Sequence, residues 1–194
     1  DSADVSSLPA NLVTTSVQDG VLSLAWNADV ASTASEGGVI IGLPAANLES
    51  VSIASQKTAQ ILDGFTSLKE VEVQSQSTLT ATIKSSTHHT DLTVDGQSTV
   101  NIVADAVNSA SVSKNSEVNL QSSSAVEKFS VANQSKLNVN GGVVTGTVTQ
   151  QSGLTVTGDV SSSVSVTEQS SIKADTISGA VTISSQSGAS ASSC

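Results

Sequence analysis

Apolar and polar residues alternate along most of this chain in a pattern that returns at nearly constant intervals. Each repeat contains a Gln-Ser pair, or once Asn-Ser, and we call the first residue of each pair the anchor: Gln76, Gln97, Asn115, Gln134, Gln151, Gln169 and Gln186. Successive anchors are 21, 18, 19, 17, 18 and 17 residues apart. The chain is therefore expected to stack similar coils.

Hydrophobes stand three residues before each anchor, at Val73, Val94, Val112, Val131, Val148, Val166 and Ile183, and three after it, at Leu79, Val100, Val118, Leu137, Leu154, Ile172 and Ala189. The alternation continues outward by two residues around most anchors. Residues of one parity point to one face of a strand, so these positions should face inward. A third apolar position, eight or nine residues before most anchors, suggests three short faces per coil: Leu68, Val107, Val126, Val143, Val160 and Ile177.

Repeats of this length are too short for helical solenoids, whose units run to roughly 33 residues or more. A looser first coil surrounds Gln56 and carries Lys57 where the others have serine. The pattern predicts an all-β, single-domain β-solenoid of about eight coils of 17–21 residues. Such a stack would be on the order of 40 Å long, given strand spacings of about 4.8 Å.

Residues 1–47 follow a different pattern and are expected to form an N-terminal extension with a capping hairpin. Asp19-Gly20 separates two alternating runs, which is a strong signal for a type I′ hairpin turn. A second strand is predicted over 39–43, where Pro44 ends it. Trp26 either covers the end of the hydrophobic column or offers a platform on which a sugar can stack.

Residues 48–194 are expected to form the solenoid repeats, ending in a small-residue tail. Residues 184–193 are almost all Ser, Ala or Gly, which is typical of a fraying last coil or a linker. Cys194 is the only cysteine, so no disulfide forms within the chain. It is either an exposed chain end or a point of intermolecular attachment.

Composition excludes several classes of function. The net charge is −10 with only seven Lys and Arg, so neither nucleic acid nor an anionic membrane surface is an expected partner. No apolar run is long enough to span a bilayer. The sequence opens on Asp1 with no signal peptide, as a processed secreted protein would, which favours an extracellular or cell-surface location.

Candidate catalytic and metal-binding groups are sparse, and we expect no enzyme activity, no metal and no cofactor. Enzymes built on β-helices cluster carboxylates on one face. The outward row four residues after the anchors contains no acid. Scattered acids are interpreted as solubilising charges: Asp91, Asp95, Asp105, Asp159 and Asp175. His88-His89 is interpreted as a solvated loop, because adjacent residues of a strand face opposite ways.

Three structural or modification features remain. Asn101, Asn119 and Asn138 share one outward row and are predicted to form a hydrogen-bonded ladder between coils. The serine that follows each anchor, which we call the anchor serine, has inward parity and should satisfy main-chain groups at a coil corner. Asn133-Gln134-Ser135 is a glycosylation sequon, so Asn133 is a candidate for an attached glycan.

The unit from Val17 through Asp-Gly to Trp26, the strand ending at Leu43-Pro44 and the segment 48–53 before the coils together resemble the head GIN domain family of auto-transporter adhesins. The resemblance covers most of the chain and implies an extracellular β-solenoid, with no catalytic residues to transfer. Two features depart from that family. The corners carry Gln-Ser or Asn-Ser instead of Gly-Ser-Gly, and the residue pattern shows none of the strands that usually precede the hairpin in that family.

The leading hypothesis for function is an extracellular structural or adhesive protein whose copies assemble head to tail into a filament, with surface glycans as a further candidate partner. Open strand edges at the ends of a solenoid template pairing. The residues expected to take part are Val5, Leu8, Val181, Ile183 and Cys194.

Two alternatives stay open. An ice-binding protein is suggested by Thr-x-Thr pairs at Thr80, Thr145, Thr147 and Thr155, although these pairs do not stay in one column. A glycan-active enzyme is disfavoured by the missing carboxylates.

Overall fold

The computed structural model describes residues 2–4, 13–18, 21–26, 40–42, 48–61, 65–84 and 89–193. The regular elements in these ranges are all β-strands. The chain divides into two compact units, residues 1–47 and residues 48–194. The all-β class predicted from the alternation is therefore confirmed.

The first unit contains the predicted hairpin strands and one strand that was not expected. β2 (Val13–Gln18) pairs antiparallel with β3 (Val21–Trp26), and the register leaves two residues for the turn. β4 (Ile40–Gly42) lies within the strand predicted over 39–43. β1 (Ser2–Asp4) pairs antiparallel with β4, and the residue pattern did not predict a strand in this opening segment. Main-chain hydrogen bonds suffice for such a pair, so its side chains need not be apolar.

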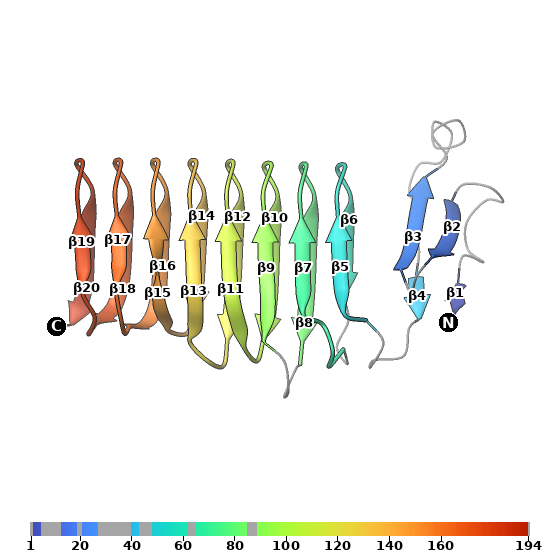
Figure 1. Ribbon diagram of the computed structural model, residues 1–194, viewed down its shortest axis with the longest axis horizontal. Coiled ribbons are helices and arrows are strands. Elements are labelled where there is room, and N and C mark those ends of the chain that lie inside the picture. The colour runs from blue at the N-terminus through green and yellow to red at the C-terminus, as the bar shows by residue number, and fades with distance from the viewer. Residues whose placement is uncertain are drawn as a thin grey trace. The chain divides into compact units, whose positions relative to one another are not determined.

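The second unit is a solenoid with two strands in each coil, arranged side by side in Figure 1. Its strands are β5 (Ser50–Ile53), β6 (Thr58–Ile61), β7 (Glu70–Val73), β8 (Thr78–Ile83), β9 (Thr90–Val94), β10 (Thr99–Ala104), β11 (Val107–Val112), β12 (Glu117–Ser122), β13 (Val126–Val131), β14 (Lys136–Asn140), β15 (Val143–Val148), β16 (Gly153–Val160), β17 (Val164–Val166), β18 (Ser171–Ile177), β19 (Val181–Ile183) and β20 (Gly188–Ser193).

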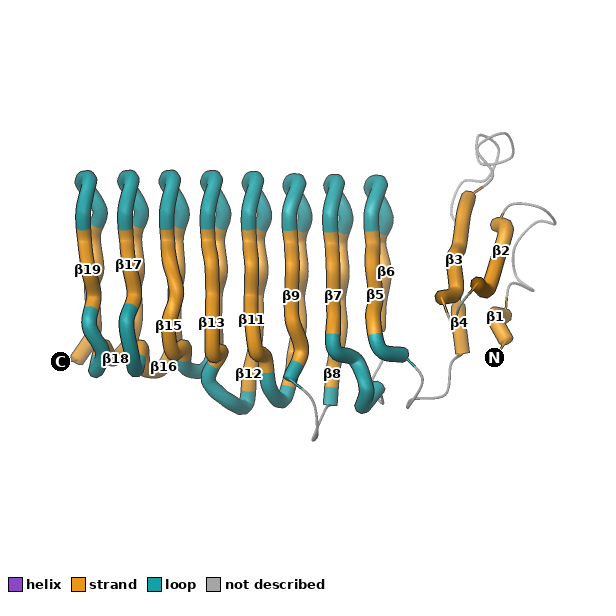
Figure 2. Tube along the Cα trace, in the orientation of Figure 1, coloured by secondary structure: helices purple, strands orange, loops and turns teal. Residues whose placement is uncertain are grey.

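Odd-numbered strands form one wall of the solenoid and even-numbered strands form the other, and neighbours within each wall are parallel. Each anchor lies in the short turn between the two strands of a coil, and Figure 2 shows these turns gathered at one end of every coil. We call each turn a corner. The sixteen strands belong to one sheet, which confirms a β-solenoid of about eight coils.

The third apolar position has no strand of its own, so a coil has two walls and not three short faces. Val126 pairs with Val143, Val143 with Val160, and Val160 with Ile177. These residues lie at the ends of strands whose other residues belong to the odd or the even wall. The pairing of Val143 with Val160 joins β15 to β16 and makes the two walls continuous.

The core is a set of apolar columns that run from coil to coil inside the walls. The members of these columns in the inner coils are buried, from Val71 and Val73 to Val166 and Ile172. The last coil differs, because Ile183 is 47% exposed. Among the described residues β19 pairs only with β17, and β20 only with β18, so no further strand covers this coil. The expectation that every hydrophobe at the inward positions is buried is therefore wrong for Ile183 and for Ala189, which are both exposed in the last coil.

The small-residue stretch at the end of the chain is part of the fold. Gly188–Ser193 forms β20, which pairs in register with β18. The described part of this stretch is thus a strand and not a linker. Ser and Ala supply the same main-chain groups as larger residues, and those groups make the ladder.

Candidate functional site

Every corner of the solenoid is built from two consecutive residues in the left-handed backbone region. They are the anchor and the residue before it, for example Gln150 and Gln151 with φ of 57° and 61°. Among the described residues, all non-glycine positions with positive φ belong to these corners. Two left-handed residues in a row are typical of a type I′ turn, which reverses the chain over a very short distance.

A ladder of anchor serines runs along the inside of the corners. In the inner coils each serine is buried, and its Oγ accepts a hydrogen bond from the main-chain N–H of the serine one coil earlier. The Ser116 N–H donates to Ser135 Oγ, and the Ser135 N–H donates to Ser152 Oγ, both at 3.2 Å. These bonds satisfy N–H groups that burial would otherwise leave without partners.

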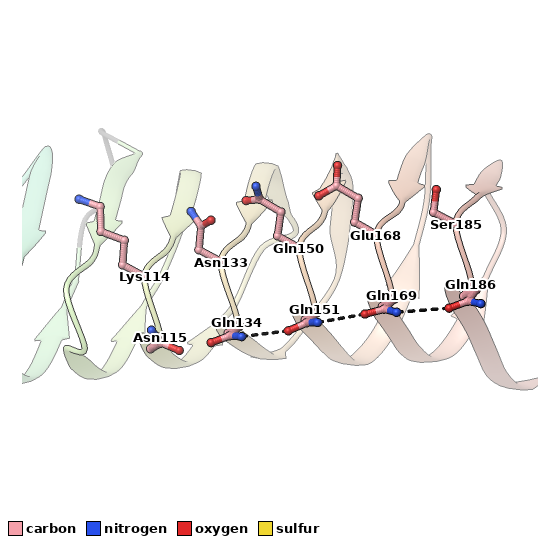
Figure 3. A pocket seen from close by; sticks show the side chains of 10 residues that line it. All are labelled: Lys114, Asn115, Asn133, Gln134, Gln150, Gln151, Glu168, Gln169, Ser185 and Gln186. Carbon is pink, nitrogen blue, oxygen red and sulfur yellow. Dashed lines mark hydrogen bonds between the residues drawn. The ribbon is translucent and has the colours of Figure 1, made fainter.

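A second ladder, of anchor glutamines, runs along the outside of the corners. Figure 3 shows Gln134, Gln151, Gln169 and Gln186 linked amide to amide. The Nε2-to-Oε1 distances along this run are 2.9, 3.0 and 3.2 Å. The ladder and the residues that precede the anchors line an open groove of ≈ 880 Å³. We call it the corner groove.

The bonds donated by the anchors and the anchor serines point in one direction along the solenoid, whereas the main-chain bonds that flank them, such as the one from the Ala132 N–H to the Val112 carbonyl, point the other way. At the corner of Gln134, the main-chain N–H donates to the Gln150 carbonyl at 2.9 Å, and Nε2 donates to Gln151 Oε1 at 2.9 Å. The N–H of Ser135 donates to Ser152 Oγ. In the three ladders formed by the anchor N–H groups, the anchor amides and the anchor serines, the donor belongs to the earlier coil, so each of these ladders ends on a donor in the last coil.

The asparagines of the even wall also form a ladder. Asn119 Nδ2 donates to Asn101 Oδ1 at 2.9 Å, and Asn138 Nδ2 donates to Asn119 Oδ1 at 2.8 Å. Asn101, Asn119 and Asn138 lie opposite one another on β10, β12 and β14. Their outward direction places these bonds on the surface of the solenoid.

Three of the acids interpreted as solubilising charges in fact join neighbouring coils: Asp91, Asp159 and Asp95, which forms an ion pair with Lys114 of the next coil. Asp91 accepts hydrogen bonds from Asn108 Nδ2 at 2.8 Å and Ser109 Oγ at 2.6 Å. Asp159 accepts from the N–H and the Oγ of Ser178, at 3.1 and 2.5 Å. The interpretation is corrected for these residues, because a carboxylate at a coil boundary can accept from hydroxyl and amide donors of the next coil.

A column of exposed and half-exposed hydroxyl side chains crosses the odd wall. Strand pairing aligns Thr93 with Ser111, then Ser130, Thr147, Ser165 and Thr182. The Thr-x-Thr pairs themselves are divided between the walls, since Thr80 and Thr155 lie on even strands whereas Thr145 and Thr147 lie on β15. The column is therefore made by serine and threonine together.

The remaining candidate residues are dispersed. Asn133 is exposed at a corner, whereas the sequon's Ser135 is buried in the serine ladder. Val181 is half-buried in β19 beside the exposed Ile183. Val5, Leu8, Asp19, Gly20, Pro44, His88 and Cys194 lie outside the described residues, as does the side chain of Trp26.

Within the described ranges, no group of three or more His, Cys, Asp or Glu side chains is placed to hold a metal ion. The same ranges contain no helix of the length and hydropathy needed to cross a membrane. His89 is exposed. Among the described residues, the polar surfaces that recur from coil to coil include the corner groove, the asparagine ladder and the hydroxyl column.

Neither the glutamine ladder nor the left-handed corners follow from the apolar pattern. The signal for the ladder is the recurrence of one amide side chain at a fixed place in every coil, since register places such residues directly above one another. The residue before the anchor differs in type from corner to corner, as Ser75 and Glu168 show, so no single residue type in the sequence indicates the positive φ that these positions share.

Comparison of the chain with protein-family models, with curated proteins and with solved structures finds no match. The resemblance to the head GIN domain family therefore stays a hypothesis that rests on the residue pattern.

Proposed function

We propose that this chain is a structural, non-enzymatic rod whose copies stack head to tail into a filament. The observation that carries this proposal is the direction of the corner ladders. In the last coil the groups at the end of these ladders are the N–H of Gln186, its Nε2 and the N–H of Ser187, all of them donors. In the first coil the matching positions are the Ser55 carbonyl and Gln56 Oε1, both acceptors. If the first coil of one copy stacked on the last coil of another, the Gln186 N–H could donate to the Ser55 carbonyl, and Gln186 Nε2 could donate to Gln56 Oε1.

The exposed hydrophobes of the last coil support the same arrangement. Ile183 belongs to a column whose members Val148 and Val166 are fully buried, and Val166 is the residue opposite Ile183. A further coil would bury Ile183 in the same way, and burying an aliphatic side chain of this size contributes about 1.5–3 kcal/mol. Such a contact joins different ends of two copies, so it propagates unless a rotation closes it.

The experiment compares two exposed hydrophobes that differ in position. Ile183 is 47% exposed on the last coil, and Val103 is 44% exposed on the outer face of β10. We expect Ile183→Lys to abolish high-mass species in sedimentation velocity, because it places a charge in the joint. Val103→Lys should leave them unchanged. Equal sedimentation of both variants and the unmodified chain would contradict end-to-end stacking.

We further propose an extracellular, adhesive setting for this rod, with surface glycans as ligands. The supporting features are the Ser- and Thr-rich outer walls, the net charge of −10 and the resemblance to adhesins noted above. A glycan array probed with the purified protein tests the ligand class. Binding to no immobilised glycan would reduce the proposal to the structural rod alone.

Ice binding is the second candidate, because the hydroxyl column stays in register from Ser111 to Thr182. Regularly spaced small hydroxyls on a flat wall can order water in a lattice. Thermal hysteresis is the measurement: Thr147→Lys should remove it, whereas Thr155→Lys, on the even wall, should not. Absence of hysteresis in the unmodified protein would exclude this candidate.

A further inference from the structure

We propose that the corner groove is a lateral docking surface for a second copy of the same chain, placed antiparallel to the first. The groove is lined by corners from Lys114 to Gln186, and Figure 3 shows the residues that precede the anchors pointing to one side of the ladder. Gln151 and Gln169 each use one N–H and one oxygen lone pair along the ladder, whereas Gln134 donates and Gln186 accepts. A primary amide has a second N–H and further acceptor capacity, so each rung can also bond sideways.

The charges of the groove are self-complementary. Among the corner residues that line it, Lys114 and Glu168 are the only charged ones. They are separated by the corners of Asn133 and Gln150, which places them three coils apart, or about 14 Å along the axis. A two-fold axis between Asn133 and Gln150 would set Lys114 of each copy opposite Glu168 of the other, and Asn133 opposite Gln150.

The alternative parallel arrangement lacks this match. It would place each Lys114 opposite the same residue of the other copy, and each Glu168 likewise, which puts like charges together. Lys114 already forms an ion pair with Asp95 of the preceding coil. Its ammonium has three donors, so it can keep Asp95 and still bind a second carboxylate. A C2 contact of this kind uses the same patch on both copies.

The test exchanges the charges at positions 114 and 168 in a parent chain that cannot stack end to end. Ile183→Lys removes end-to-end stacking, and Asp95→Asn prevents repulsion when the charge at position 114 is reversed. In this parent we expect a monomer–dimer equilibrium by analytical ultracentrifugation at low ionic strength. Lys114→Glu or Glu168→Lys alone should weaken the dimer by about tenfold or more, because each sets like charges opposite one another.

The double variant, Lys114→Glu with Glu168→Lys, should restore the dimer to within about threefold of the parent. Lys136→Glu, an exposed lysine of β14 outside the groove, serves as the matched control and should change little. A parent that stays monomeric at every concentration, or a double variant as weak as the singles, would overturn the proposal. Because the ends are blocked throughout, either result leaves the filament proposal to its own experiment.

Discussion

A single aromatic side chain shows how closely the residues of one column are matched in size. Phe129 is buried, and its neighbours in the column are Ala110 in the previous coil and Gly146 in the next. A Cβ on Gly146 would lie 2.2 Å from the Phe129 carbonyl oxygen and 2.7 Å from its ring. The small residues on both sides make room for the large one.

We expect Gly146→Ala to destabilise the fold by about 1–3 kcal/mol, because the added methyl meets main chain that is held in the parallel ladder. Gly188→Ala is the control, since a Cβ there has nothing within 4 Å. Urea unfolding of both variants gives the comparison. Equal midpoints for the two would show that the column is not packed as described.

At the scale of an element, the corner is the costly part of each coil. A left-handed residue other than glycine costs roughly 1–2 kcal/mol, and asparagine adopts this conformation more readily than glutamine does. Gln150 has φ of 57° and is exposed. The ladders on either side of the corner offset this strain with coil-to-coil hydrogen bonds.

Gln150→Asn is therefore predicted to raise stability by about 0.5 kcal/mol and the thermal midpoint by about 1–2 °C. The matched control is Gln121→Asn, the same substitution at an exposed position of β12, where asparagine is a poor strand residue. Calorimetry on the two variants decides. A lower midpoint for the corner variant than for the strand variant would contradict the proposed relief of strain.

The strands were predictable because burial forces a period of two, and the columns from Val73 to Val166 made that period visible. The anchor spacing likewise predicts the coil count. The left-handed corners were not predictable, because residues as different as Lys114 and Glu168 occupy the same position in their respective corners and have nearly the same φ. β1 was missed since its pairing with β4 requires no apolar side chain.

At the scale of the whole molecule, the proposed joint between copies has one unmatched group. The Ser187 N–H would face the position of Lys57, which has no hydroxyl where every later coil has serine. The joint should thus be weaker than a contact between two coils of one chain. We expect this difference to keep single rods populated at low concentration.

Lys57→Ser would supply the missing hydroxyl, and we expect it to lower the concentration at which high-mass species form by about tenfold. Lys57→Ala removes the same lysine without adding an acceptor and is the control. Light scattering across a dilution series compares them. If alanine promotes assembly as strongly as serine does, the serine ladder does not cross the joint.

The most direct measurement of the central claim is electron microscopy of the concentrated, unmodified chain. Head-to-tail stacking predicts straight filaments in which the coil spacing of about 4.8 Å continues along the axis from one copy into the next. A field of separate short particles at every concentration, with no filaments, would contradict it.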